Sequence, residues 1–262
     1  MSRYVAIGSV CWDVVEGEDA PRLGGSVLFA GRVAQEAGWD VEVITSGTAE
    51  LEAAVRAALP DVEVTVQRSA HDTVMAFGAQ ADLGPQRVPT VADPIDLVRL
   101  GRDHAEGDVV HLAPIMGEVT PELIAQLAGA AFVGITPQGL LRTREAFTHR
   151  LRLLESPDVW WAGHVDAIVV SESEHARLAD ESLAAGRAVA ITRGERGCCG
   201  WSGTERVDLP GISLASVSPT GTIGAGDVFA AALFLALAGG SSFADAMDAA
   251  NGRAAAHVGG TV

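Results

Sequence analysis

The feature that most constrains the fold of this chain is a regular alternation of short apolar runs with helical segments. Runs that are typical of buried strands recur along the chain, at residues 3–10, 41–45, 62–66, 71–77, 108–112, 132–136, 167–170 and 188–192. Continuous apolar runs of this length are typical of strands covered on both faces, and the intervening segments have helical spacing. The alternation therefore predicts an α/β fold with three layers, α/β/α, around a doubly wound, mainly parallel sheet. No repeat or long linker divides the chain, so we expect one domain over residues 1–262.

The charge and composition of the chain exclude several classes of function. With 34 acidic residues against 18 basic ones the formal net charge is −16, which argues against a nucleic-acid surface. The longest apolar run, residues 228–238, is shorter than the roughly 18 residues of a membrane span, and no secretory leader is apparent. We therefore expect a cytoplasmic protein that binds neither nucleic acid nor membrane.

All basic residues of this chain are arginine, and lysine is absent. This excludes the P-loop lysine, the strand lysine of protein kinases and Schiff-base chemistry. The three cysteines include an adjacent pair but no C-x-x-C motif, so neither a zinc site nor a disulfide framework is expected. If the protein handles a nucleotide, backbone amides, glycine loops and arginines must hold the phosphates.

The stretch Gly224-Ala225-Gly226-Asp227 stands directly before the apolar run of residues 228–238. Small residues at the start of a helix leave backbone N–H groups open to an anion, and the helix dipole favours negative charge there. In this setting Asp227 is a candidate general base, and residues 224–226 a candidate anion hole for a transferring phosphoryl group. The alternative is an ordinary acidic residue in the first turn of a helix.

Thr222 together with Gly224, Ala225, Gly226 and Asp227 resembles the second signature of the ribokinase-like (PfkB) carbohydrate kinase family. The block that begins Gly24-Gly25-Ser26-Val27 resembles its first signature. Phe29 stands where most members have an asparagine, and the turn PQG-x-x-R at residues 137–142 is similar to the myo-inositol kinase branch. The resemblance covers almost the whole chain and implies an ATP-dependent kinase that phosphorylates a hydroxyl of a small polyol or sugar, a cyclitol such as myo-inositol above all.

The resemblance also implies roles for individual residues. It implies a substrate site made by Asp13, Gly25, Ser26, Phe29, Gln138 and Arg142. It implies a nucleotide site made by Thr192, Arg193, Gly194, Gly197, Thr222 and Asn251. Glu174 corresponds to the acid that orders Mg²⁺ through its waters. Asp13 and Glu174 each have an alternative, purely structural role. Asp13 could cap a turn, and Ser171-x-x-Glu174 has the pattern of a capping box.

The chain departs from the family pattern in three places. Gly221 replaces the usual acid of the second signature, which leaves dependence on a monovalent cation open, and Ser171 replaces an asparagine. Residues 16–22 leave little room for the usual lid, so we expect a reduced or absent lid, with a homodimer as one way to complete the site. These departures keep two alternatives open, namely a non-catalytic nucleotide- or polyol-binding protein and a kinase for a pentose or nucleoside. A dinucleotide-dependent oxidoreductase is disfavoured, because no GxGxxG follows the first strand.

Overall fold

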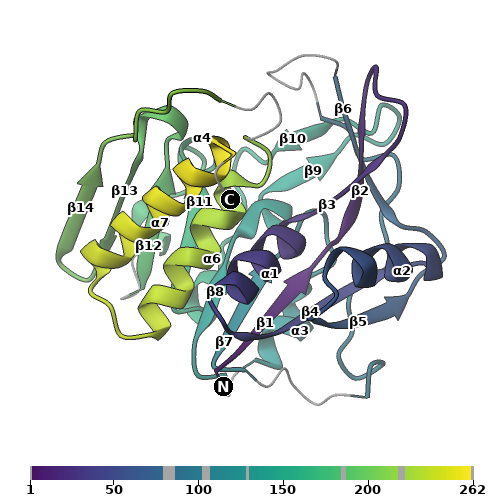
Figure 1. Cartoon of the computed structure of the whole chain (residues 1–262), viewed down its shortest axis with the longest axis horizontal. Coiled ribbons are helices and arrows are strands. Elements are labelled where there is room, and N and C mark those ends of the chain that lie inside the picture. Colours follow the sequence, from purple (N-terminus) through teal and green to yellow (C-terminus); the bar gives the residue numbers. More distant parts are fainter. Residues whose placement is uncertain are drawn as a thin grey trace.

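The main sheet is built from the apolar runs, which lie side by side in the middle of the molecule. The computed structural model describes residues 2–78, 86–101, 107–127, 130–183, 187–217 and 222–260. In this part of the chain the strands of the main sheet run in the order β14-β13-β12-β11-β8-β7-β1-β4-β5 (Figure 1). Their bounds are β1 Arg3–Gly8, β4 Asp40–Gly47, β5 Glu63–Arg68, β7 Val109–Ala113, β8 Val133–Ile135, β11 Ala167–Ser171, β12 Ala188–Thr192, β13 Cys198–Ser202 and β14 Glu205–Leu209. Neighbours from β5 to β12 pair in parallel, whereas β13 and β14 pair antiparallel at one edge.

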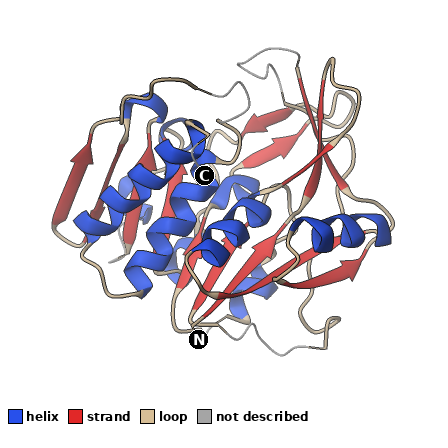
Figure 2. Cartoon of the chain, viewed as in Figure 1, coloured by secondary structure: helices blue, strands red, loops and turns tan. Residues whose placement is uncertain are grey.

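Helices cover both faces of this sheet, which confirms the predicted three-layer α/β/α fold (Figure 2). The described helices are α1 Ser26–Glu36, α2 Ala49–Ala58, α3 Pro121–Ala125, α4 Glu172–His175, α5 Asp180–Leu183, α6 Ala225–Ala238 and α7 Phe243–Val258, with the 3₁₀ turns η1 Pro137–Leu140, η2 Trp160–His164 and η3 Gly194–Arg196. None of the described helices is long and apolar enough to cross a membrane.

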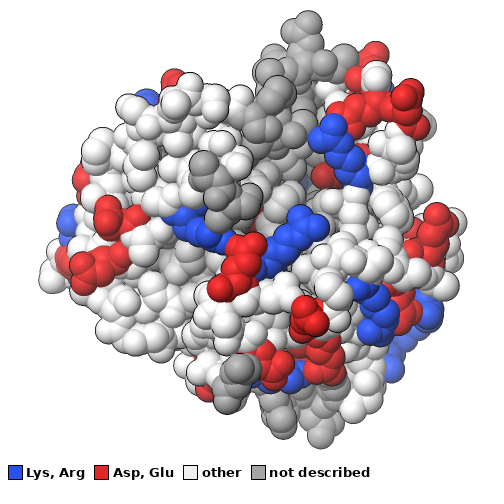
Figure 3. Space-filling model, viewed as in Figure 1, with Lys and Arg blue, Asp and Glu red and all other residues white. Residues whose placement is uncertain are grey.

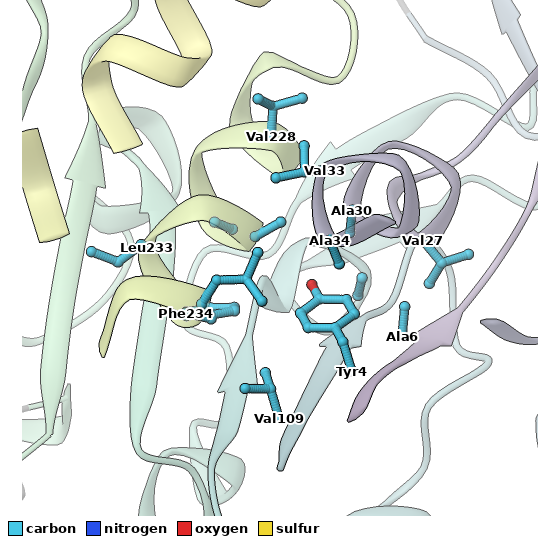
Figure 4. Close-up of a cluster of buried hydrophobic side chains, with 14 of the residues drawn as sticks. Tyr4, Ala6, Val27, Ala30, Val33, Ala34, Val109, Val228, Leu233 and Phe234 are labelled. Carbon is cyan, nitrogen blue, oxygen red and sulfur yellow. The ribbon is translucent and has the colours of Figure 1, made fainter. Parts of the chain in front are cut away.

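Two hydrophobic cores result from the alternation of side chains along the strands. Tyr4 and Ala6 of β1 pack into the core under α1 and α6, while Val5 and Ile7 pack into the core on the opposite face. Figure 4 shows the first core, where side chains from α1 and α6 meet those from β1 and β7. Alternate side chains of β1 therefore pack against the helices on opposite faces of the sheet.

A second sheet lies beyond the carboxyl ends of β1 and β4. It contains β2 Cys11–Val15, β3 Arg22–Gly24 and β6 Thr73–Phe77, in the order β3-β2-β6. The segment around Arg87 extends it: the Arg87 N–H donates to Ala76 O at 3.0 Å, and the Leu151 N–H donates to Gln86 O at 2.9 Å. These bonds join the first sheet to the hairpin of β9 Arg142–Arg144 and β10 Leu151–Leu153. We call this whole layer the lid sheet.

The lid is therefore present, and only the expectation that it could be absent is wrong. Strand β3 fits in the short polar stretch after β2, and β6 pairs in parallel with β2. The run of residues 71–77 was expected as a strand, but nothing in its pattern separates a lid strand from a strand of the main sheet. The β9–β10 hairpin and the antiparallel β13–β14 pair were not predicted either, because their strands are short or mixed in polarity.

Candidate active site

The amino terminus of α6 lies at the centre of the candidate site. Gly224 is its N-cap residue, has φ 77°, and leaves the first turn without a side-chain cap. A Cβ on Gly224 would lie 2.6 Å from ring atoms of Phe29, so both the backbone conformation and the close packing require glycine here. The first turn thus presents uncapped amides and the positive end of a 14-residue helix, which suits an anion.

Asp227 sits in this first turn and faces other ionisable groups. Burial raises the pKa of its carboxyl to about 7, and the nearby charges of Glu174 and Asp13 act in the same direction. A hydrogen bond from Ser26 and the charge of Arg142 act in the opposite direction. A carboxylate with a pKa near neutrality is suited to accept a proton from a hydroxyl group.

Asp13 lies on β2 at the edge of the same cluster, with 6% of its surface exposed. The Cys11 thiol donates to Asp13 Oδ1 at 3.3 Å, and burial raises the pKa of Asp13 to about 6. The carboxyl packs directly on Gly24 of β3, where a Cβ would lie 2.1 Å from Asp13 Oδ2. Gly24 therefore makes room for the carboxyl group, which the first signature places next to Gly25 and Ser26.

Arg142 from the lid sheet and Glu174 from α4, which follows β11 of the main sheet, complete the cluster. Arg142 Nη2 lies 3.8 Å from Glu174 Oε1, and both side chains are largely buried. Burial lowers the pKa of the Arg142 guanidinium, while Glu174 and Asp227 favour its charged form. Glu174 Oε2 accepts hydrogen bonds from the Ser171 N–H and hydroxyl, both at 2.8 Å, so the capping box is formed.

Gln138 is half-buried on η1, in the turn that leads to Arg142. The turn is held against the exit of β7, because the Gly139 N–H donates to Pro114 O at 2.8 Å. A Cβ on Gly139 would lie 2.6 Å from the backbone of Ile115. The close packing of this turn thus places Gln138 and Arg142 after the exit of β8 and beside the exit of β7.

Glu118 is a functional candidate that the sequence analysis did not identify. Only 1% of its surface is exposed, and its carboxylate accepts three backbone N–H groups. The donors are Ser9 at 2.9 Å, Ile115 at 2.6 Å and Met116 at 2.7 Å. Glu118 therefore ties the exit of β1, which leads into the strand of Asp13, to the exit of β7. The sequence feature that could have identified Glu118 is its position directly after Gly117, in the turn that follows a predicted strand.

A cavity of about 820 Å³ opens on the other side of the α6 amino terminus. Five of the six residues expected to bind nucleotide line it, namely Thr192, Gly194, Gly197, Thr222 and Asn251. Ala225 and Gly226 of the proposed anion hole also line it. Much of the remaining wall is apolar, and two of its side chains, Ile212 and Val217, are 48% and 57% exposed. The cavity and the carboxylate cluster thus meet at the first turn of α6.

Two of the expected ligand-binding side chains are engaged elsewhere. Arg193 pairs with Asp208 at 2.6 Å and donates to Cys198 O at 3.1 Å, so its guanidinium is held against the β13–β14 edge. The ring of Phe29 packs against Gly224 and, edge to face, against His257 at 5.7 Å. We therefore assign Phe29 to shaping the α6 amino terminus. Gly221 lies outside the described residues.

Glu174 is the acid that the family resemblance implies beside a Mg²⁺ ion. One carboxylate oxygen is used by the capping box, whereas Oε1 has the long 3.8 Å contact with Arg142. Among the described residues no group of three or more His, Cys, Asp or Glu side chains forms a metal cluster. The arrangement fits an ion held largely by water and phosphate oxygens, which is the usual mode for Mg²⁺ at phosphates.

The sequence model described as pfkB family carbohydrate kinase matches residues 108–261. A search of curated protein sequences found no match.

Solved structures share the fold over nearly the whole chain. A pyrophosphate-dependent kinase in the ribokinase family, solved with a pyrophosphate analogue and myo-inositol, is 22% identical, with a TM-score of 0.83 over 97% of this chain and 94% of that one. Arabidopsis thaliana ribokinase, complexed with ribose and ATP, is 18% identical, with a TM-score of 0.74 over 98% and 92%. Ribokinase from Thermotoga maritima is 18% identical, with a TM-score of 0.70 over 99% and 93%.

Proposed function

Because the chain belongs to the PfkB family of carbohydrate kinases, we propose that it transfers the γ-phosphoryl group of ATP to a hydroxyl of a small polyol or sugar. The observation that carries this proposal is the position of Asp227, at the turn where the cavity meets the cluster of Asp13, Ser26 and Arg142. A cyclitol such as myo-inositol is the first acceptor to test, since the PQG-x-x-R turn of residues 137–142 resembles that branch and one similar structure was solved with myo-inositol.

In the proposed reaction the acceptor lies against Asp13, Ser26, Gln138 and Arg142. Asp227 takes the proton from the reacting hydroxyl, whose oxygen forms a bond to the γ-phosphorus. The bond from the γ-phosphorus to its bridging oxygen breaks, and ADP leaves with that bond's electron pair. Amides at the start of α6 and the Arg142 guanidinium stabilise the charge on the transferring group. Glu174 would hold the waters of Mg²⁺, which neutralises phosphate charge when bound.

The experiment that tests this function measures ADP release with Mg-ATP against a panel of acceptors. The panel contains inositols, aminocyclitols, pentoses, hexoses and nucleosides. We expect turnover with one class of acceptor and formation of its phosphate ester. ATP binding without turnover on any acceptor would instead support the non-catalytic binding protein.

Pyrophosphate is the second candidate donor, because three similar structures are of pyrophosphate-dependent kinases. The apolar wall of the cavity favours a nucleotide, since Ile212 and Val217 would be covered by a base and ribose but not by pyrophosphate. Arg196 is the cavity's one basic lining side chain in the described part of the chain, and it pairs with Glu172. A donor bound through phosphates alone would have few cations to hold it.

Substituting Ala255 by Phe should distinguish ATP from pyrophosphate as the phosphoryl donor. Ala255 lines the cavity on α7, so a phenyl ring there fills the space that a nucleobase would occupy. We expect the KM for ATP to rise at least tenfold, with little change for any activity that uses pyrophosphate. Steady-state kinetics with each donor measures this.

The matched control for this variant is Ala249→Phe, on the exposed side of α7. It should leave the KM for both donors unchanged. A KM for ATP that is unaffected by Ala255→Phe would contradict nucleotide binding in this cavity.

A further inference from the structure

A second pocket lies along β10, away from the cavity at α6. It has a volume of about 480 Å³ and is lined by Arg150, Leu151, Arg152, Leu153, Glu155 and Arg177. It shares no lining residue with the cavity at α6. Three arginines thus meet in one pocket of a chain whose net charge is −16.

The backbone pairing of the lid sheet places a further arginine beside this pocket. Arg87 and Arg150 are directly opposite each other in an antiparallel bridge, so their side chains leave the same face of the sheet. Like charges in such a pair destabilise a sheet unless an opposite charge is near. The acidic side chains near this pair therefore decide how much positive charge is left for an anion.

Two acids face these arginines. Glu145 forms an ion pair with Arg152 and lies close enough to Arg150 to interact with its charge. Glu155 lines the pocket itself. Within the described residues, Arg150 and Arg177 have no ion pair, so the three arginines that line the pocket face Glu145 and Glu155, and a net positive charge is left.

We propose that this pocket is a second anion site, which binds a small molecule that carries a phosphate group. Guanidinium groups bind phosphate through paired hydrogen bonds, and several arginines that converge on one pocket are the usual way to hold it. The pocket volume exceeds what a free phosphate ion needs and accommodates a phosphorylated small polyol. No catalytic step is assigned to it.

The anion site is joined to the candidate active site through two short connections. Leu153 is the cross-strand partner of Arg142 in the β9–β10 pair. The Arg177 N–H donates to Glu174 O at 2.9 Å, directly after α4. A bound anion therefore contacts the same strand and the same turn that position Arg142 and Glu174.

Calorimetric titration tests the anion site. Inorganic phosphate, pyrophosphate and myo-inositol 1-phosphate are each titrated into the wild-type protein and into Arg150→Ser/Arg177→Ser, with and without a non-hydrolysable ATP analogue and Mg²⁺. We expect at least one probe to bind the wild type at least tenfold more tightly than the variant. Preference for myo-inositol 1-phosphate would identify an organic phosphate as ligand, and equal binding of the inorganic ions would identify free phosphate.

The control is Arg99→Ser/Arg206→Ser, which removes the same charge from two exposed arginines outside the pocket. It should bind the probe as the wild type does. Absence of binding to the wild type, unchanged affinity in the pocket variant, or an equal loss in the control would each overturn the proposal. Circular dichroism and the thermal midpoint establish that the variants are folded. The titration requires no turnover, so its outcome is independent of the proposed kinase activity.

Discussion

Replacing Asp227 by Asn should lower kcat by a factor of about 10² to 10⁴, which is the usual contribution of a general base. The amide keeps the shape of the side chain and cannot accept the proton of the attacking hydroxyl. Since Asp227 does not line the cavity, binding of the nucleotide should change little. Rapid-quench or steady-state assays measure the rate, and calorimetry measures ATP binding.

The same variant should change the pH profile of kcat/KM. Burial raises the pKa of Asp227 to about 7 in the folded protein, so below this pH the base is protonated and inactive. The wild-type kcat/KM should therefore fall by about tenfold per pH unit below pH 7 and level off above it. The residual kcat/KM of Asp227→Asn should not show this fall below pH 7.

The control for this prediction is Asp248→Asn, which makes the same chemical change on an exposed position of α7. It should retain the wild-type rate and pH profile. Near wild-type turnover in Asp227→Asn would remove Asp227 from the role of base.

Replacing Glu118 by Ala should lower the free energy of unfolding by about 3–5 kcal/mol, because three buried backbone N–H groups lose their acceptor. The loss is a large fraction of the 5–15 kcal/mol that stabilises a typical domain. Glu118→Gln should cost less, since the amide keeps one oxygen acceptor of the same shape. Urea denaturation measures both changes.

Glu50→Ala, on the exposed side of α2, is the control for Glu118 and should change the free energy of unfolding by no more than about 0.5 kcal/mol. In Glu118→Gln we expect the KM for the acceptor to rise, because the exit of β1 leads directly to the strand of Asp13. A loss of stability below about 1 kcal/mol in Glu118→Ala would show that water replaces the carboxylate.

The periodicity of the chain was enough to predict the layers of the fold, because strands buried on both faces leave continuous apolar runs. It was also enough to locate the α6 amino terminus, because glycine and alanine followed by an acid and an apolar run are typical of the start of a helix. Of the residues proposed to bind nucleotide, Thr192, Gly194 and Gly197 lie at or directly after the exit of β12, where backbone topology fixes position, whereas Asn251 lies on α7.

Other features could not be predicted, because they depend on partners far away in the sequence. The pairing of Arg193 with Asp208 requires the β13–β14 hairpin, and the contact of Phe29 with Gly224 requires α1 and α6 to be adjacent. The lid sheet depends on β6 leaving the main sheet, which its alternation does not reveal. On the face seen in Figure 3, acidic and arginine side chains lie in small groups among uncharged surface, so net charge alone gave no indication of the arginine pocket.

The hydrogen bonds around Arg87 connect the strand of Asp13 to the strand of Arg142, since β2 and β9 belong to the same lid sheet. We expect a shift of one of these strands to be transmitted to the other through these hydrogen bonds. Asp227 lies instead on α6, and the cavity is lined in part by α6 and α7. In the proposed reaction the acceptor would therefore contact the lid sheet on one side and the start of α6 on the other, and the spacing of these two elements would set the distance from its hydroxyl to the donor.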